Sequence, residues 1–233
     1  VELVELGLVR QLRDLGEYRL STKLASLGLS WLSRTGISDF AQPLLDHLAE
    51  VSGELVRLSV IDGDRLTWVA RAQGARQGLR YDPDMGSDAR LSCSSSGWAV
   101  LAALPDEDAM RWVRAQGVGR PREFGPHAPS TLEAVMREVR ATRRRGYSIT
   151  RETYSAGLNA MAAAVLRQGQ PIGAITIAGP SVRFTVKRME ALGQELLAIA
   201  DKMAAASGAS VFFQTAVRAG PVAGGGAHAK AVR

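Results

Sequence analysis

Three consecutive serines, Ser94 to Ser96, carry the clearest chemical signal in the sequence. They precede an apolar run at residues 97–104 that predicts a helix ended by Pro105. Serine hydroxyls and the unpaired backbone N–H groups of a helix N-terminus lie at the positive end of the helix dipole, where they can bind a carboxylate or another anion. The same serines could simply N-cap the helix. The residue pattern leaves both interpretations open.

Cys93, beside the serines, is the one cysteine of the chain, which excludes an intramolecular disulfide and a secreted disulfide scaffold. A nucleophilic cysteine or serine needs a nearby base, but His47, His127 and His228 fall in a predicted helix, a loop and the tail. The sequence also has no serine-hydrolase motif, no metal-ligand spacing and no glycine-rich phosphate loop. We therefore expect no catalytic residue, no metal, no cofactor, and a buried Cys93.

The composition is that of an ordinary globular protein, because 46% hydrophobic and 22% charged residues are enough to build a core and a solvated surface. The net charge of +6 modestly favours a polyanionic partner. No apolar stretch is long enough to span a membrane, and no signal-peptide pattern opens the chain. We expect a soluble, cytoplasmic protein with no membrane partner.

The elements that would position the serines alternate between strands and helices. Period-two apolar patterns predict one hairpin from residues 55–61 and 66–72, and another from 161–166 and 172–178. Further predicted elements are a strand at 146–150, an edge strand within the loop 74–90, and helices at 39–51, 107–116, 131–145 and 186–206. This order predicts an α/β (α+β) fold with an antiparallel sheet flanked by helices, of the PAS/GAF kind.

The first residues have the pattern of an interrupted unit. Residues 1–6 have the pattern of the last turns of a helix, with Gly7 as its C-cap. Short strand-like runs at 8–12 and 18–20 follow, and Ser21 can N-cap a long helix that reaches Arg34. A helix without a beginning suggests that this segment was cut from a larger domain.

Four stretches, in this order and spacing, resemble the IclR family of bacterial transcriptional regulators. They are LVELGLVRQLRDLGEYRLSTKLASLG, AQPLLDHLAEVSGELVRLSVIDGDRLTWV, RLSCSSSGWAVLAALP, and the segment from RRRGYSITRETYSAGLNAMAAAV to GQPIGAITIAGPSVRF. The resemblance implies the end of a winged helix-turn-helix domain at 1–20, a linker helix at 21–36 and a GAF-like effector-binding domain at 37–207. Residues 208–233 would be a largely disordered tail.

The same resemblance implies a function and its partners. It implies a regulator in which a small organic effector, a carboxylate among the candidates, modulates binding to operator DNA, and which assembles as a homodimer or homotetramer. Two alternatives stay open on the sequence: a stand-alone sensory or interaction module that does not bind DNA, and a small hydrolase or redox enzyme that uses Cys93 or a serine.

Effector-binding positions of the family can be carried over residue by residue. The resemblance places effector contacts at Ser94, Ser95, Ser96, Thr150, Leu158, Ala160, Thr176 and Ala178, with Asn159 as a further hydrogen-bonding candidate. A loop from Leu79 to Met85 would close over the ligand, with Tyr81 and Met85 as adaptable apolar walls. Leu158, Ala160 and Ala178 are equally well interpreted as core residues, and Arg183 as a structural ion-pair partner.

This sequence departs from the family at four of its expected site positions. Relatives usually have a histidine at Ser92, a lysine at Trp98, an acidic residue at Thr150 and frequently a cysteine at Ala160. The first two changes predict a less basic and bulkier pocket edge. The neutral, small Thr150 and Ala160 favour an effector that is larger or less polar than a keto acid of two or three carbons.

Basic residues near the N-terminus are candidates for DNA-backbone contacts. Arg10, Arg13, Arg19 and Lys23 lie on and around the predicted wing, where such side chains contact phosphates without reading sequence. Base readout would fall to earlier residues of a recognition helix, which this sequence does not contain. We therefore expect operator DNA to be a partner of the full-length protein.

Overall fold

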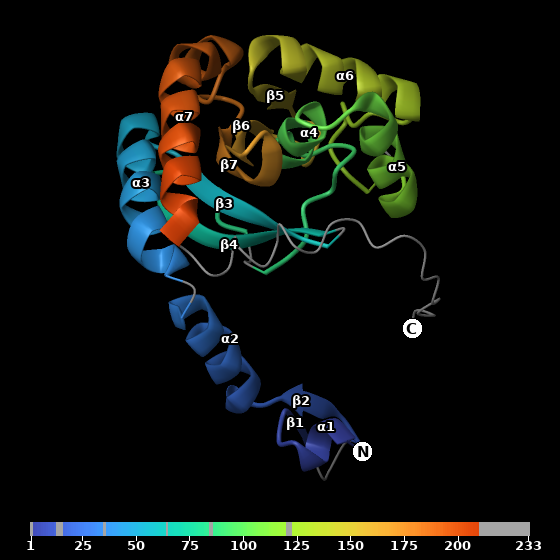
Figure 1. Ribbon diagram of the computed structural model, residues 1–233, viewed down its shortest axis with the longest axis vertical. Helices are drawn as coiled ribbons and strands as arrows, with labels where there is room; N and C mark the ends of the chain where they lie inside the picture. The colour runs from blue at the N-terminus through green and yellow to red at the C-terminus, as the bar shows by residue number, and fades with distance from the viewer. Residues whose placement is uncertain are drawn as a thin grey trace.

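The computed structural model describes residues 2–12, 16–34, 36–63, 65–83, 86–119 and 123–209. A sheet with helices on both faces forms the main body, and one helix extends from it and carries a small hairpin at its far end (Figure 1). The tail at 210–233, where we predict disorder, lies outside the described residues. Within the described part, no helix is long and apolar enough to cross a membrane.

Five antiparallel strands form the sheet in the order β4-β3-β7-β6-β5. Their bounds are Leu55–Asp62 (β3), Arg65–Gln73 (β4), Ser148–Arg151 (β5), Leu158–Arg167 (β6) and Gln170–Pro180 (β7). Both predicted hairpins are present, and the pairing of β3 with β7 joins them into one sheet. β6 and β7 are longer than predicted because their ladder continues to the pair Leu158 and Pro180, beyond the alternating apolar run.

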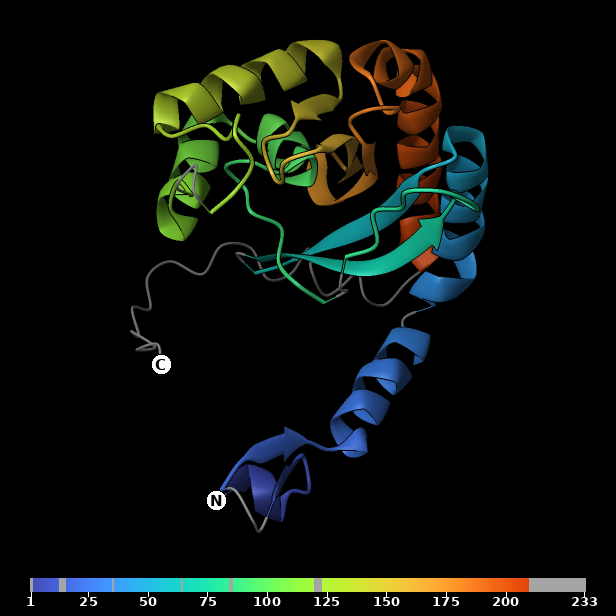
Figure 2. The same ribbon diagram turned by 180° about the vertical axis from the view of Figure 1, so that it is seen from behind.

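Helices cover both faces of this sheet. Their bounds are Ile37–Ser52 (α3), Ser95–Ala102 (α4), Asp106–Gln116 (α5), Leu132–Arg145 (α6) and Val186–Ala206 (α7), with a short 3₁₀ turn at Ser207–Ala209 (η1). α3 and α7 lie on one face, and α4, α5 and α6 lie on the other (Figures 1 and 2). The predicted α+β class, an antiparallel sheet flanked by helices, is confirmed.

Side chains alternate between the two faces of the sheet along each strand, and this alternation decides which residues lie on the α4 side. On β3, Val56 and Leu58 are buried in the core beneath α3 and α7. Because successive strand residues point to opposite faces, Arg57 and Ser59 point toward the side of α4. On β7, Ile175 and Ile177 belong to the α3 and α7 core, so Thr176 faces the α4 side as well.

Two boundaries differ from the sequence-based expectations. α4 begins at Ser95 rather than at Gly97, because the side chain of Ser94 accepts a hydrogen bond from the Gly97 N–H and makes Ser94 the N-cap. The predicted edge strand in the loop 74–90 is absent from the described part of that loop, where a single bridge pairs Asp88 with Thr67. That loop is rich in Gly and Asp, which favour turns over ladders.

The N-terminal unit consists of α1 (Glu2–Glu5), β1 (Val9–Gln11), β2 (Tyr18–Leu20) and the extended helix α2 (Thr22–Arg34). Gly7 ends α1 with a φ of +69°, as its C-cap prediction requires. The hydroxyl of Ser21 donates to the carbonyl of Gly7 and so ties the start of α2 to the end of α1. The unit stands at the far end of α2, away from the sheet (Figure 2).

Candidate functional site

A small cavity lies where the N-terminus of α4 meets the α4 side of the sheet. Eight predicted effector contacts line it: Ser94, Ser95, Ser96, Thr150, Leu158, Ala160, Thr176 and Ala178. Arg57, Trp68 and Tyr154 complete the lining. The cavity volume is about 10 Å³, close to the smallest space that holds one water molecule. The structure therefore brings most of the predicted residues together around one small cavity.

The serine turn is fixed in place by both capping and tertiary bonds. The oxygen of Ser94 accepts from the Gly97 N–H at 3.0 Å and lies 3.3 Å from the oxygen of Ser96. The hydroxyl of Ser148 on β5 donates to the carbonyl of Ser95 at 2.8 Å. The first N–H groups of a helix have no partner within the helix, so this end of α4 presents donors and a positive dipole toward the cavity. The same serine turn can therefore cap α4 and bind an anion.

The strand wall of the cavity combines an apolar patch with two threonines. Leu158, Ala160 and Ala178 form a small apolar cluster that also contacts Tyr81 and Tyr154. The hydroxyl of Thr150 donates to the carbonyl of Ala160 at 3.0 Å, which leaves its oxygen free to accept. The oxygen of Thr176 has no hydrogen-bond partner among the described residues.

Arg57, Trp68 and Tyr154 were not predicted as site residues. Arg57 is only 3% exposed, and its guanidinium carbon lies 3.9 Å from the centroid of the Trp68 ring. Trp68 in turn meets the ring of Tyr154 edge-on, with centroids 6.0 Å apart. The sequence contained a signal for Arg57, because the alternation within residues 55–61 places it on the same face as Ser59 and Ile61.

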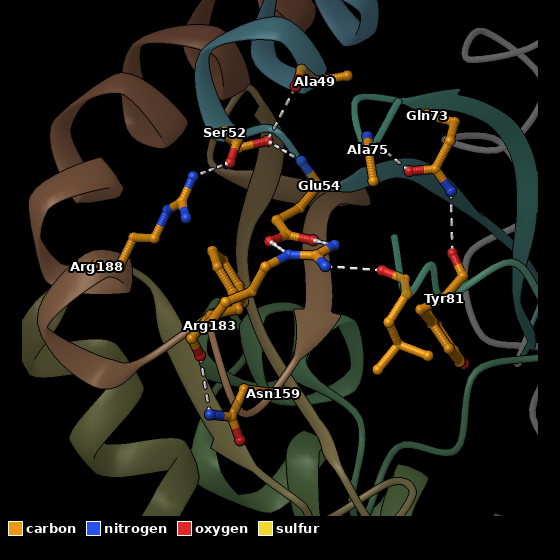
Figure 3. Close-up of polar contacts among 11 residues, drawn as sticks. Ala49, Ser52, Glu54, Gln73, Ala75, Tyr81, Asn159, Arg183 and Arg188 are labelled. Atoms are coloured by element: carbon orange, nitrogen blue, oxygen red, sulfur yellow. Dashed lines mark hydrogen bonds and ion pairs between the residues drawn. The ribbon is translucent and has the colours of Figure 1, made fainter. Parts of the chain in front are cut away.

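A loop at residues 78–83 packs through Tyr81 on the apolar residues that line the cavity, and three side chains hold it. Figure 3 shows the bonds from Arg183 and Gln73. Arg183 donates to the carbonyl of Leu79 at 2.7 Å, and Gln73 donates to the carbonyl of Tyr81 at 3.1 Å. Arg71 forms an ion pair with Asp82. We call residues 78–83 the cover loop.

The three loop residues that were predicted to contact the effector do not share one role. Tyr81 packs against the apolar cluster of Leu158, as predicted for a wall residue. Leu79, predicted as an effector contact, is 66% exposed and does not line the cavity, and its carbonyl accepts from Arg183. Met85 lies outside the described residues.

The anchor of the cover loop is a buried ion pair. Arg183 donates through Nε and Nη2 to the two carboxylate oxygens of Glu54, at 2.7 and 2.8 Å. The side chain of Glu54 is 2% exposed, and the pair raises the pKa of Arg183. The interpretation of Arg183 as a structural ion-pair partner is confirmed. Its third contact, to Leu79, links this pair to the cover loop (Figure 3).

Asn159 does not join the cavity, although it was a predicted hydrogen-bonding contact. Its position between Leu158 and Ala160 on β6 turns it to the opposite face of the strand. There its amide donates to the carbonyl of Phe184 at 2.9 Å (Figure 3). It lines a separate open groove of about 760 Å³. The charged residues of that groove are Arg137, Glu138, Arg151 and Glu152.

Ser92 and Trp98, which were predicted to form a less basic and bulkier pocket edge, do not line this cavity. The indole N–H of Trp98 donates to the carbonyl of Ser92 at 3.0 Å, and Trp98 lines the open groove rather than the cavity. Ser92 is fully buried, and its hydroxyl accepts from the Gly119 N–H. Instead, the cavity acquires a positive charge from β3, through Arg57.

Cys93 is buried next to the serine turn, and burial raises the pKa of its thiol to about 12. The thiolate is the reactive form of cysteine. Among the described residues, no group of three His, Cys, Asp or Glu side chains gathers as in a metal site. Burial and the raised thiol pKa indicate that Cys93 is a packing residue rather than a nucleophile.

Cys93 is expected to resist alkylation by iodoacetamide at pH 8 in the folded protein. Raising the pKa from 9 to about 12 lowers the thiolate fraction by roughly 1000-fold. Mass spectrometry of samples labelled with and without urea measures the difference, and the rate should rise with pH as the thiolate forms. Labelling at equal rates in both samples would contradict a buried, protonated thiol.

The predicted DNA-backbone contacts lie on the N-terminal unit. Arg10 on β1 and Arg19 on β2 are exposed and directly opposite each other in the ladder. Like charges facing each other destabilise a strand pair unless an anion lies between them. Lys23 donates to the carbonyl of Leu6 at 2.8 Å, so its ammonium also supports the end of α1. Arg13 lies outside the described residues.

Comparisons with known proteins agree with this architecture. The family model for the bacterial transcriptional regulator IclR C-terminal domain matches residues 29–205. The transcriptional repressor IclR of Escherichia coli is 28% identical over 205 residues, which cover 87% of this chain and 73% of that protein.

Solved structures of regulators share the fold. An IclR transcriptional regulator from a Silicibacter species has a TM-score of 0.76 at 22% identity, with 89% of this chain and 80% of that chain covered. An IclR homologue from Microbacterium hydrocarbonoxydans, complexed with 4-hydroxybenzoate, has a TM-score of 0.70 at 21% identity and covers 90% and 83%. With its C-terminal domain matched from residue 29 to residue 205, this chain belongs to the IclR family of bacterial transcriptional regulators.

Proposed function

We propose that the cavity between α4 and the sheet binds a small organic effector, and that its occupation changes the affinity of the native protein for operator DNA. The observation that carries this proposal is the gathering of eight predicted contacts around one cavity at a helix N-terminus. The solved IclR homologue of similar fold that is complexed with 4-hydroxybenzoate supports a ligand of that size.

The route from the cavity to DNA runs through the elements that enclose it. The cover loop follows β4, β4 pairs with β3, and α3 packs on this hairpin and joins α2. A ligand that favours one arrangement of these elements biases the orientation of α2, provided that it binds the two arrangements with different affinity. Because α2 carries the N-terminal hairpin, its orientation sets the position of Arg10 and Arg19 relative to DNA.

In this proposal, the three parts of the chain have the roles that the sequence predicts. Residues 1–20 act as the end of a winged helix-turn-helix domain, 21–36 as a linker helix and 37–207 as the effector-binding domain. Arg10, Arg13, Arg19 and Lys23 contact DNA phosphates. The protein acts in the cytoplasm by binding rather than by catalysis, and the burial of Cys93 supports the absence of a reaction at that residue.

The test measures DNA affinity with and without effector. DNA fragments are selected from a random pool with the native protein that carries this sequence, and the dissociation constant is then measured at fixed salt. Compounds that raise the melting temperature of the protein are added to the complex. A shift in DNA affinity supports the proposal. Effector binding with unchanged DNA affinity would instead indicate a sensory module without a role at DNA.

A homodimer or homotetramer is expected to depend on the exposed leucines of α2. Leu24 and Leu27 are 39% and 53% exposed and lie one turn apart on a helix that extends from the main body, while Leu29, 68% exposed, lies on another side of it. Adjacent exposed apolar side chains of this kind mark an interface. Leu27→Glu should weaken self-association by at least 10-fold, since it places a charge in that interface. Analytical ultracentrifugation measures the effect, with the exposed Ser26→Glu as matched control. Equal association of both variants would place the interface elsewhere.

A further inference from the structure

Arg57 is a buried cation whose hydrogen-bonding groups are only partly satisfied, because it has a side-chain hydrogen bond with Tyr81 and leaves two of its nitrogens without a partner. It is 3% exposed, it lines the cavity, and its Nε and Nη1 have no hydrogen-bond partner among the described residues. A buried donor without an acceptor costs free energy, and a buried charge costs more. A side chain kept in this state suggests that its partner is a molecule from outside the chain.

The unsatisfied atoms around the cavity specify what that partner must offer. The indole Nε1 of Trp68 and the hydroxyl of Thr176 also lack a partner among the described residues, and both residues line the same cavity. Arginine and tryptophan nitrogens can only donate. Ser95 and Ser96, the first residues of α4, also line the cavity, and the first N–H groups of a helix have no partner within it, so donors come from two directions. The missing partner is therefore an acceptor with at least two oxygens.

The charge balance of the site indicates an anion. Within the described part of the chain, no Asp or Glu side chain lines the cavity. Arg71 lies opposite Arg57 in the strand pair and adds positive charge, while its own carboxylate partner Asp82 is at the surface. Arg57 stays protonated because a guanidinium does not lose its proton in proteins. A ligand carboxylate would supply the missing negative charge and accept two parallel N–H bonds from the fork of Arg57.

The other residues around the cavity indicate that the rest of the ligand is flat and apolar. Trp68 lies directly under the guanidinium, Tyr154 stands edge-on to Trp68, and Tyr81 packs on the apolar cluster of Leu158 from the loop. The opposite wall is made of the short side chains of Ala160 and Ala178, beside Leu158. Aromatic rings on one side and small aliphatic groups on the other fit a planar ring better than a branched or polyhydroxylated chain.

We infer that Arg57 is the anion anchor of this cavity and that its ligand is an aromatic monocarboxylate, whose carboxylate pairs with Arg57 and whose ring lies against the wall of Leu158, Ala160 and Ala178. This inference rests on the proposed effector function. It adds a charged anchor on β3 to the serine turn of α4 and narrows the effector to one chemical class.

The test compares benzoate with benzamide, which has the same shape without the charge. The purified chain is titrated with each by calorimetry, alongside acetate as a carboxylate without a ring. We expect benzoate to bind best of the three. Arg57→Met should weaken benzoate binding roughly 10- to 100-fold, the range for a charged hydrogen-bonded pair, and leave benzamide binding unchanged. The matched control is Arg111→Met, which removes an exposed arginine of α5.

Ligand-free stability separates an anchor from a structural arginine. Replacing a buried, unpaired cation by an apolar side chain of similar length is neutral or stabilising, so Arg57→Met should melt at the wild-type temperature or above it. A melting temperature several degrees lower would identify a structural arginine and overturn the inference.

The binding outcomes also distinguish the inference from the proposed function. Wild-type protein that does not bind benzoate at millimolar concentration, or binds it equally well after Arg57→Met, overturns the inference. Binding that depends on Arg57 but leaves the affinity for selected DNA unchanged upholds the inference and overturns the proposed function instead.

Discussion

Arg183→Met is expected to lower the free energy of unfolding by about 3 kcal/mol, because it leaves the carboxylate of Glu54 buried without its counter-charge. Two charge-assisted hydrogen bonds are lost at once. We place the effect at the lower end for buried pairs because Arg183 itself is 31% exposed and water can partly replace it. Urea unfolding followed by circular dichroism measures the change.

The double variant Glu54→Gln with Arg183→Met is the control for this prediction. Removing both charges leaves no uncompensated ion, so the double variant should be more stable than Arg183→Met alone. If the double variant were as unstable as the sum of both single changes, the two side chains would not be coupled. The explanation through a buried charge would then fail.

The same substitution should also release the cover loop. Arg183 holds the carbonyl of Leu79, next to the exposed Arg80. Without that bond, trypsin should cleave after Arg80 several-fold faster under native conditions, since cleavage follows the population of the opened segment. Cleavage after the exposed Arg111 on α5 serves as the internal reference.

Gly97→Ala is expected to abolish effector binding and to cost roughly 1–3 kcal/mol of stability, the range for overpacking a buried site. A methyl group at this position would lie 2.6 Å from the Cα of Leu91 and 2.7 Å from its carbonyl oxygen. Both are backbone atoms, so the first turn of α4 has to move. That movement displaces Ser94 and Ser96, whose geometry shapes one wall of the cavity.

Gly28→Ala is the matched control, because Gly28 lies within α2 with nothing within 4 Å of the added methyl group. Alanine is the better helix former, so this change should stabilise the protein slightly or leave it unchanged. Calorimetric titration and thermal unfolding of both variants give the comparison. Normal effector affinity in Gly97→Ala would show that the serine turn is not part of the binding site.

Much of the fold was predictable, because the two hairpins and the helices follow directly from the period of their apolar residues. The strand pattern around Leu158 and Ala160, and around Thr176 and Ala178, also places these residues on a common face. Their meeting with Ser94 depends on the pairing of β3 with β7 and on the packing of α4 on the sheet. These long-range contacts leave no periodic signal, and the family resemblance supplied them.

The parts that were missed share a physical cause. Charged strand residues are usually interpreted as solvent-facing, so Arg57 was not considered, although its alternation with Val56 and Leu58 marked it as opposite to that core. The family resemblance predicts Trp98 at the pocket edge, where relatives have a lysine. On a helix whose first seven residues are all buried, adjacent residues reach different surroundings.

The size of the cavity has a kinetic consequence. A volume of about 10 Å³ admits no organic effector until Tyr81 and the cover loop move aside, so association requires an opening step that does not involve the ligand. The observed association rate should then level off at high ligand concentration, at the rate at which the loop opens. The occupied cavity has to stay wider than the empty one, so the empty and the occupied protein differ in the position of this wall. The regulator would thus respond to the average effector concentration over several opening times and ignore shorter fluctuations.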